Sequence, residues 1–137
     1  MPGGYLEFQD PLYPFLFAVD VDPDTPFARW VRLLSEGGEK TGRSWMNVQH
    51  YQRYMKEAGF EDVVERRFYW PFGPWAKGEY YKAVGALFKE DILNGLEGIS
   101  LKILGILGWK VEDIRAFLAD VREDMMNHAS SKAYLPM

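Results

Sequence analysis

The sequence has no cysteine, few clustered basic residues and no long apolar run. Without cysteine, the 137 residues form no disulfide, thiolate nucleophile or thiolate metal site. The net charge is -4 and the only adjacent basic pair is Arg66–Arg67, which argues against DNA or RNA as a ligand. No apolar run approaches the roughly 20 residues of a membrane span, and residues 1–10 are not expected to form a signal peptide. We therefore expect a cytoplasmic protein.

Aromatic residues, in contrast, are abundant, at 16% of the chain. Five of the eight residues in Phe68–Trp75 are aromatic, and Pro71 and Pro74 prevent a continuous helix or strand there. This stretch, which we call the aromatic joint, divides one domain of residues 1–137 into a strand-and-helix part, 1–70, and a helical part, 71–137. Its rings either line a ligand cleft or fill a packed corner, and the sequence leaves both possibilities open.

Before the joint, the periodicity of apolar residues predicts four elements and an irregular crossing. Thr25 and Pro26 are typical of a helix start, Asn47 of a second one, and Gly59 of a helix end. Val63–Tyr69 alternates, with Val64 and Phe68 expected inward. The expected elements are a strand at Tyr5–Gln9, an irregular crossing at Pro11–Pro26, a helix from Pro26 to Glu36 ended by Gly37–Gly38, a helix from Val48 to Ala58, and a strand at Val63–Tyr69.

After the joint, the pattern becomes helical. Glu79–Leu107 is thickly apolar, and the glycines of its 94–98 stretch predict a bend or a split. Gly108 should end it. A last helix is expected at Val111–Asn127, with Val111 on its buried stripe, and Ala133–Met137 is expected to be only an extended lead-out.

The chain resembles a known family in several segments that occur in order. Pro2–Asp10, PGGYLEFQD, resembles the turn and fifth strand of class I S-adenosylmethionine-dependent methyltransferases, in the fungal secondary-metabolism branch related to LaeA. The similarity continues through the helix to Leu34, Glu57–Phe60, Trp70–Trp75, Gly95–Gly98, Leu107–Trp109, Val121–Met125 and Ala133–Tyr134.

This resemblance implies the C-terminal half of such a fold: an α/β remnant with two or so short strands and a mostly helical lid. The family's glycine-rich cofactor loop is not found in the sequence, so we expect no cofactor and no appreciable S-adenosylmethionine binding. A strand remnant without its neighbours exposes unpaired amides, which predicts completion by a homodimer. A cavity could form at that interface, and a swap of the Glu79–Leu107 helix would meet the same need.

The catalytic candidates are side chains that move a proton or polarise a carbonyl. His50 is the leading candidate for a general acid or base, because histidine is the residue type suited to that role near neutral pH, although a surface role is also open. Tyr51, which follows it on a predicted helix, offers a hydroxyl that could hydrogen-bond a carbonyl. Glu7 and Gln9 share one side of the first strand. His128 is expected only to interact with a helix C-terminus. No metal site is expected. The expected walls of an apolar substrate site are Trp30, Tyr54, Trp70, Phe72, Trp75 and Tyr80.

These observations, with the resemblance, favour a cofactor-independent cyclase of fungal-type natural-product biosynthesis, possibly a Diels–Alderase or other pericyclase, acting on a polyketide-like substrate. Such a reaction needs apolar walls and one or two hydrogen-bond donors. Two alternatives stay open. One is a non-catalytic pseudo-methyltransferase that serves as a partner or regulator, and the other is a fragment of an S-adenosylmethionine-dependent methyltransferase.

Overall fold

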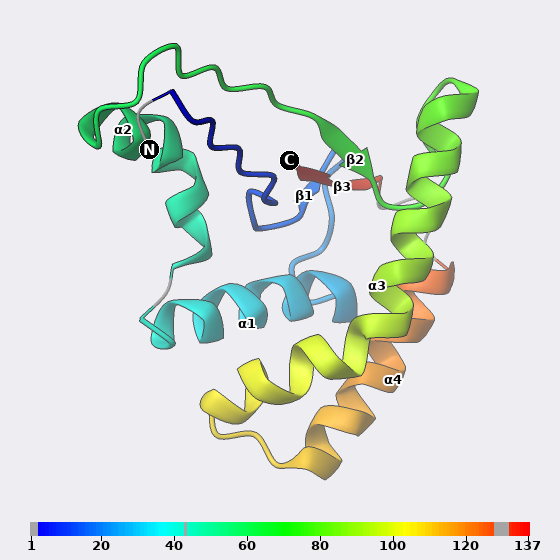
Figure 1. Cartoon of the computed structure of the whole chain (residues 1–137). Helices are drawn as coiled ribbons and strands as arrows, with labels where there is room; N and C mark the ends of the chain where they lie inside the picture. Colours follow the sequence, from blue (N-terminus) through cyan, green and yellow to red (C-terminus); the bar gives the residue numbers. More distant parts are fainter. Residues whose placement is uncertain (1–2, 43, 128–131) are drawn as a thin grey trace.

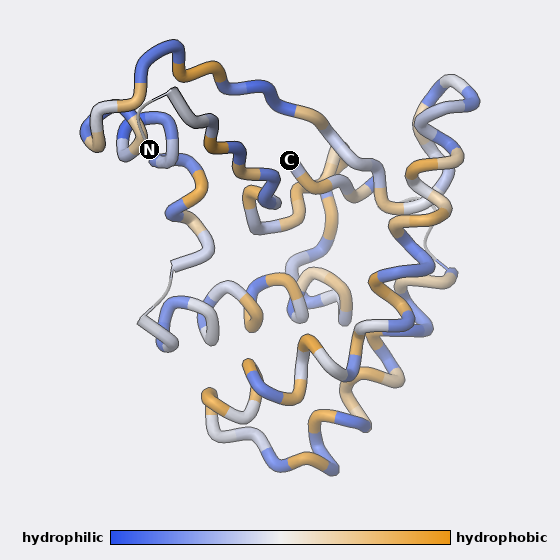
Figure 2. Tube along the Cα trace, viewed as in Figure 1, coloured by the Kyte–Doolittle hydropathy of each residue, from blue (hydrophilic) through white to orange (hydrophobic). Residues whose placement is uncertain are grey.

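The computed structural model describes residues 3–42, 44–127 and 132–137. Figure 1 shows α1, α3 and α4 packed together beside a small sheet, with α2 set apart from them. Apolar and polar residues alternate along these helices, as Figure 2 shows. The elements are β1 (Leu16–Phe17), α1 (Pro26–Lys40), the 3-10 helix η1 (Trp45–His50), α2 (Tyr51–Glu57), β2 (Tyr69–Pro71), α3 (Glu79–Ile106), α4 (Val111–Asn127) and β3 (Ala133–Pro136).

The sheet has the order β1-β3-β2, and both pairings are antiparallel. In its centre, Tyr134 is paired with Leu16 on one side, and Leu135 with Trp70 on the other. The expectation that 133–137 is only a lead-out was therefore wrong. Its backbone is hydrogen-bonded on both edges and its Ala133 and Leu135 side chains are buried, which makes it the best-held strand of the sheet.

Two predicted strands are corrected by the structure. Residues 5–9 form no strand, because no described segment pairs with them. In the second case only Tyr69 of the predicted Val63–Tyr69 strand is in a strand, and β2 instead continues to Pro71. Val64 and Phe68, expected inward, are 75% and 59% exposed. Alternation of apolar and polar residues was therefore not enough to place residues 5–9, or most of Val63–Tyr69, in the sheet.

Helix α1 begins at Pro26 as predicted, but its capping differs. The Thr25 side chain does not cap it; Thr25 Oγ1 lies 3.0 Å from the Asp22 carbonyl oxygen and donates to it. The buried face, Phe27, Trp30, Val31 and Leu34, is as expected.

The predicted stop of α1 at Gly37–Gly38 was wrong, since the helix runs on to Lys40. A Cβ on Gly37 would lie 2.9 Å from the backbone oxygen of Ile103, and one on Gly38 would lie 3.3 Å from the Trp45 ring. These glycines are required for close packing of α1 against α3 and η1, which a local pattern does not reveal.

The α2 region starts earlier than predicted. Ser44, rather than Asn47, caps it, because Ser44 Oγ accepts a hydrogen bond from the Met46 amide at 3.2 Å. The first six residues then form η1, and α2 ends at Glu57, close to the predicted end. Gly59 has a positive φ of 91°, which confirms its role after the helix end.

Helix α3 is unbroken from Glu79 to Ile106 but changes direction along its length, as Figure 1 shows. The predicted bend is therefore confirmed, without a split. Ser100 Oγ donates to the Leu96 carbonyl at 2.6 Å, a backbone contact that favours bending. Gly108, with a φ of 89°, ends the helix as expected. The bounds of α4 match the prediction, although Val111 is 46% exposed rather than buried.

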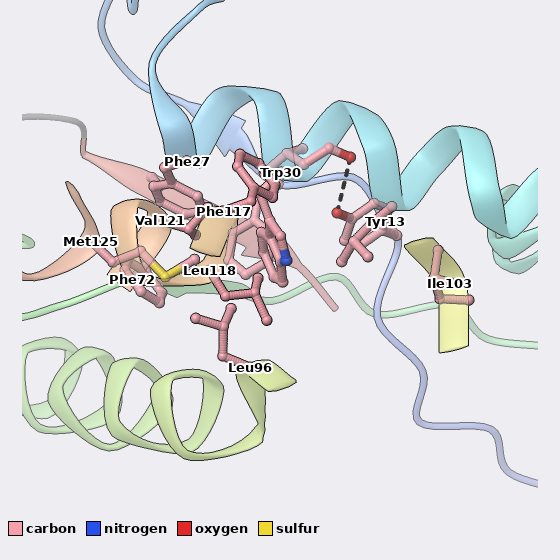
Figure 3. Packing of buried hydrophobic residues seen from close by; sticks show 14 of the residues in the cluster. Tyr13, Phe27, Trp30, Phe72, Leu96, Ile103, Phe117, Leu118, Val121 and Met125 are labelled. Carbon is pink, nitrogen blue, oxygen red and sulfur yellow. Dashed lines mark hydrogen bonds between the residues drawn. The ribbon is translucent and has the colours of Figure 1, made fainter. Parts of the chain in front are cut away.

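The core is an aromatic and aliphatic cluster between α1, α3, α4 and the sheet (Figure 3). Phe15, which precedes β1, lies at its centre and contacts the rings of Phe27, Phe72 and Phe88, with ring centroids 5.6 to 5.8 Å apart. Much of the high aromatic content therefore fills this core.

Candidate functional site

The aromatic joint is partly a packed corner and partly an open surface. Phe72 is 6% exposed, and Trp75 Nε1 donates to the Ala133 carbonyl oxygen at 3.0 Å. Phe68, Tyr69 and Trp70 are exposed, with the Trp70 ring resting on Phe88 at 5.7 Å. The first half of the joint thus faces solvent, while the second half holds the sheet to α3.

The expected substrate-wall residues lie in different environments. Trp30 is 1% exposed and its indole N–H donates to Ser100 Oγ at 2.9 Å, so it belongs to the core (Figure 3). Tyr80, at the start of α3, is 73% exposed and contacts Tyr81, with ring centroids 5.3 Å apart. Tyr54, another of the six expected wall residues, lines a groove in a different part of the molecule.

That groove lies where the N-terminal segment crosses α2. It is open to solvent, has a volume of about 230 Å³ and is almost wholly apolar. The rings of Phe8 and Tyr51 are 4.9 Å apart and hold the segment to the helix. We call this the α2 groove; it is lined by Leu6, Phe8, Tyr51, Tyr54, Met55, Ala58 and Phe60.

Polar and charged side chains lie beside the α2 groove. Partial burial of Tyr51, together with the charge of the Asp10 carboxylate, raises the pKa of the Tyr51 hydroxyl. The half-buried His50 ring lies 5.9 Å from the Tyr54 ring, centroid to centroid. Arg53 places its guanidinium over the same Tyr54 ring, 5.1 Å from its centroid. Tyr51 and Tyr54 therefore line the groove and are themselves in contact with polar or charged side chains.

Glu7 and Gln9 lie together, as expected, but both are exposed. Gln9 Nε2 donates to Glu7 Oε1 at 2.6 Å. In an extended segment, alternate side chains point to opposite faces, so Leu6 and Phe8 face α2 while Glu7 and Gln9 face away. The structure brings Tyr51 and Tyr54 to the groove and leaves the Glu7–Gln9 pair on the other side. His128 lies outside the described residues.

Sequence reasoning missed most of the groove's lining. The alternation of Leu6 and Phe8 was visible, but it was assigned to a sheet rather than to contact with a helix. Among residues 3–42, 44–127 and 132–137, no three His, Asp or Glu residues gather as a metal site would need. Within the same residues, no helix is both long and apolar enough to cross a membrane.

Comparison with curated proteins shows that the chain is similar to part of fungal methyltransferases and of LaeA-like regulators. The methyltransferase-like family expected from the sequence is thus confirmed. The chain is 35% identical over 132 residues to "Probable methyltransferase tdiE" of Emericella nidulans and 30% identical over 130 residues to "Methyltransferase pytC" of Aspergillus terreus. It is 29% identical over 101 residues to "Secondary metabolism regulator laeA" of Aspergillus fumigatus.

The matches cover much of this chain but only part of each relative. For tdiE and pytC they include 92% and 93% of this chain and 40% of the relative, and for laeA 72% and 27%. The chain thus spans about two fifths of the length of the first two. No family model matches it, and no solved structure matches it. A small sheet with a mostly helical remainder is compatible with part of a methyltransferase-like fold.

Proposed function

We propose that this chain is the acceptor-side module of a methyltransferase-like protein of fungal secondary metabolism, and that it acts with a donor-binding region carried by the same or another polypeptide. The observation that carries the proposal is the match of 92% of the chain to 40% of tdiE. The rest of such a relative is available to bind the methyl donor. Two further features support the proposal: an apolar groove lined in part by two tyrosines, and exposed aromatic residues on β2.

The division of labour follows from the chemistry of the donor. S-adenosylmethionine is held in this family by a glycine-rich loop between a strand and a helix, where backbone amides approach the cofactor closely. Neither Gly3–Gly4 nor Gly37–Gly38 has that context: the described residues that follow Gly4 are not helical until Pro26, and Gly37–Gly38 lies inside α1. Apolar walls such as those of the α2 groove suit an apolar acceptor instead.

The test is donor binding by the chain alone and together with the missing region. Titration calorimetry of the 137-residue chain with about 1 mM S-adenosylmethionine should give no saturable heat. The measurement is a strict test, because even a weak complex with a Kd of about 1 mM, which corresponds to about -4 kcal/mol, is tested at this concentration. The chain co-expressed with the part of tdiE outside the match should form a complex that binds the donor. Saturable one-to-one binding by the chain alone would contradict the proposal, and so would failure of the two parts to associate.

The α2 groove favours a second candidate, a cofactor-independent cyclase that folds a polyketide-like substrate, for example in a Diels–Alder type step. In this case Tyr51 or Tyr54 donates a hydrogen bond to a substrate carbonyl, and His50 supports them. The apolar walls Leu6, Phe8 and Phe60 hold the reacting carbons close together. Two copies pair as a homodimer and close the groove, which in one chain is open to solvent.

Its test is ligand binding and oligomeric state in the same sample. Light scattering of the chain alone should report a dimer. An apolar polyene should quench the protein's own fluorescence in wild type, but much less in Met55→Glu, because this variant places a charge in the groove. Lys56→Glu, on the same helix but outside the groove lining, is the matched control. A monomer that quenches no better than the Met55→Glu variant would exclude the cyclase.

A further inference from the structure

Four aromatic rings line the α2 groove, and they come from three separate segments of the chain. Phe8 belongs to the N-terminal segment, Tyr51 and Tyr54 to α2, and Phe60 to the loop that follows this helix. Figure 1 shows the N-terminal segment next to α2, which is set apart from the packed helices. Phe8, Tyr54 and Phe60 are 51%, 42% and 39% exposed. A ligand in the groove can therefore contact aromatic rings of more than one segment.

The surroundings of these rings favour a positively charged ligand. The guanidinium of Arg53 already lies over the Tyr54 ring, 5.1 Å from its centroid, because the face of an aromatic ring attracts cations. Arg53 is itself paired with Glu57, with Nε and Oε1 3.7 Å apart, so its own charge is partly compensated. Partial burial and the charge of the Asp10 carboxylate raise the pKa of the Tyr51 hydroxyl, which puts a negative charge close to the groove. The whole chain carries a net charge of -4.

The lining of the groove also selects the kind of cation, because it offers almost no polar surface. A lysine ammonium group has three N–H donors, and in the groove it would lose hydrogen bonds to water without replacing them. A quaternary ammonium group has no N–H donor and is covered by carbon substituents. It therefore needs only apolar contact and the faces of aromatic rings, which is how aromatic cages bind such cations.

We propose that the α2 groove binds the quaternary ammonium group of a small molecule, held by the four rings and by the charge of Asp10. The inference rests on the proposed function, because it names the chemical class of the acceptor at the same groove: a tertiary amine, whose methylated product is this cation. In the transfer from S-adenosylmethionine, the nitrogen lone pair forms the new N–C bond and the C–S bond of the donor breaks. The positive charge passes from sulfur to nitrogen, and no proton is released.

A pair of ligands of equal shape tests the charge directly. Choline is compared with 3,3-dimethylbutanol, which has a carbon atom in place of the charged nitrogen. Binding of each to the full chain is followed by nuclear magnetic resonance, from the shift of the ligand's methyl proton signals next to aromatic rings. Choline should bind at least about fivefold more tightly, because the cation–π contact adds to the apolar contacts that both ligands make. Equal affinities would overturn the inference and leave the proposed function with a neutral apolar acceptor.

Variants of Tyr54 separate the contribution of its ring from that of its hydroxyl. Tyr54→Leu removes the ring but keeps an apolar side chain, so it should weaken choline binding about fivefold and change 3,3-dimethylbutanol binding by less than about twofold. Tyr54→Phe keeps the ring and is the matched control, with choline binding within about twofold of wild type. Asp10→Asn should weaken the binding of choline only. The far-ultraviolet circular dichroism of all three variants should match wild type, because both positions are exposed.

The outcomes keep the two proposals apart. If choline does not bind the chain, the inference is overturned, and donor binding by the complex with the rest of tdiE still decides the proposed function. Preferential choline binding by a chain that does not associate with that region keeps the quaternary ammonium site and contradicts the proposed function. S-adenosylmethionine, whose sulfur carries one methyl group and two larger substituents, should not displace choline, and displacement would also contradict the proposed function. Should Tyr54→Leu not fold, the two ligands on the wild-type chain decide the case.

Discussion

Asp124 in α4 accepts a hydrogen bond from the backbone amide of Phe27, with Oδ2 and N 2.8 Å apart. Phe27 is in the first turn of α1, where amides have no partner within the helix. The neighbouring Thr25 side chain does not cap the helix, so a carboxylate from a distant helix takes over this role. Asp124 is 9% exposed, so the contact joins α1 to α4 inside the protein.

Asp124→Ala should lower the free energy of unfolding by about 1–3 kcal/mol, since the Phe27 amide would be left buried without its acceptor. Asp124→Asn keeps an oxygen acceptor and should lose less. Urea denaturation monitored by circular dichroism measures both. Asp120→Ala, an exposed position of the same helix, is the control, and an equal loss there would contradict the capping role.

Gly85→Ala should destabilise the chain by about 1–3 kcal/mol, as expected for an overpacked contact. A Cβ at Gly85 would lie 2.8 Å from the carbonyl carbon of Gly73, where the aromatic joint crosses α3. Gly98→Ala, in the same helix with nothing within 4 Å, should instead stabilise by up to about 1 kcal/mol. Thermal unfolding of the two variants should therefore shift in opposite directions, and a shared direction would show that the contact with Gly73 does not limit this site.

Tyr13 should make the protein less stable at alkaline pH. It is buried, its hydroxyl donates to the Val31 carbonyl at 3.1 Å, and burial raises its pKa well above the ordinary value of 10.0. The unfolded chain therefore ionises first, so the stabilisation is fully present below about pH 10 and declines above it by up to about 1.4 kcal/mol per pH unit.

Tyr13→Phe tests this sign. It should lose about 0.5–1.5 kcal/mol at neutral pH with the hydrogen bond, and show a flatter decline than wild type in urea titrations between about pH 9 and about pH 11. Tyr80→Phe, at an exposed site, should keep the wild-type slope. An unchanged slope in Tyr13→Phe would mean that another group causes the alkaline loss.

Ser100 and Trp30 should be energetically coupled, because the indole N–H of Trp30 donates to Ser100 Oγ with both side chains buried. Ser100→Ala should cost about 1–3 kcal/mol. In the Trp30→Phe background the same change should cost about 0.5–1.5 kcal/mol less, since no indole N–H is left unpaired. A double-mutant cycle in urea measures this, and strict additivity would contradict the coupling.

Local signals predicted the helices well. Pro26, Gly59 and Gly108 each act through their own backbone conformation, which is why the start of α1 and the ends of α2 and α3 could be read directly. The bounds of α4 follow from an apolar stripe with acidic residues in its first turn. At these positions, the residues that determine where a helix starts or ends all lie within one short segment of the sequence.

Contacts between distant residues were not predictable in this way. Gly37 looked like a helix stop, whereas its small size serves the approach of Ile103, 66 residues along the chain. Residues 133–136 looked too short to matter, because a strand's pairing depends on partners elsewhere. The α2 groove was missed for the same reason: Leu6 and Phe8 alternate as in a sheet but pack on a helix.

The central position of β3 has a consequence for the order of folding. Leu16 pairs with Tyr134, and β1 and β2 are not paired with each other but are joined through β3. Closing such a long loop has a high entropic barrier, whereas helices form from neighbours within nanoseconds to microseconds. We therefore expect the α1, α3 and α4 core to assemble before the sheet, which is complete only when β3 reaches β1 and β2. During synthesis on a ribosome, β1 and β2 would remain unpaired edges until β3 emerges.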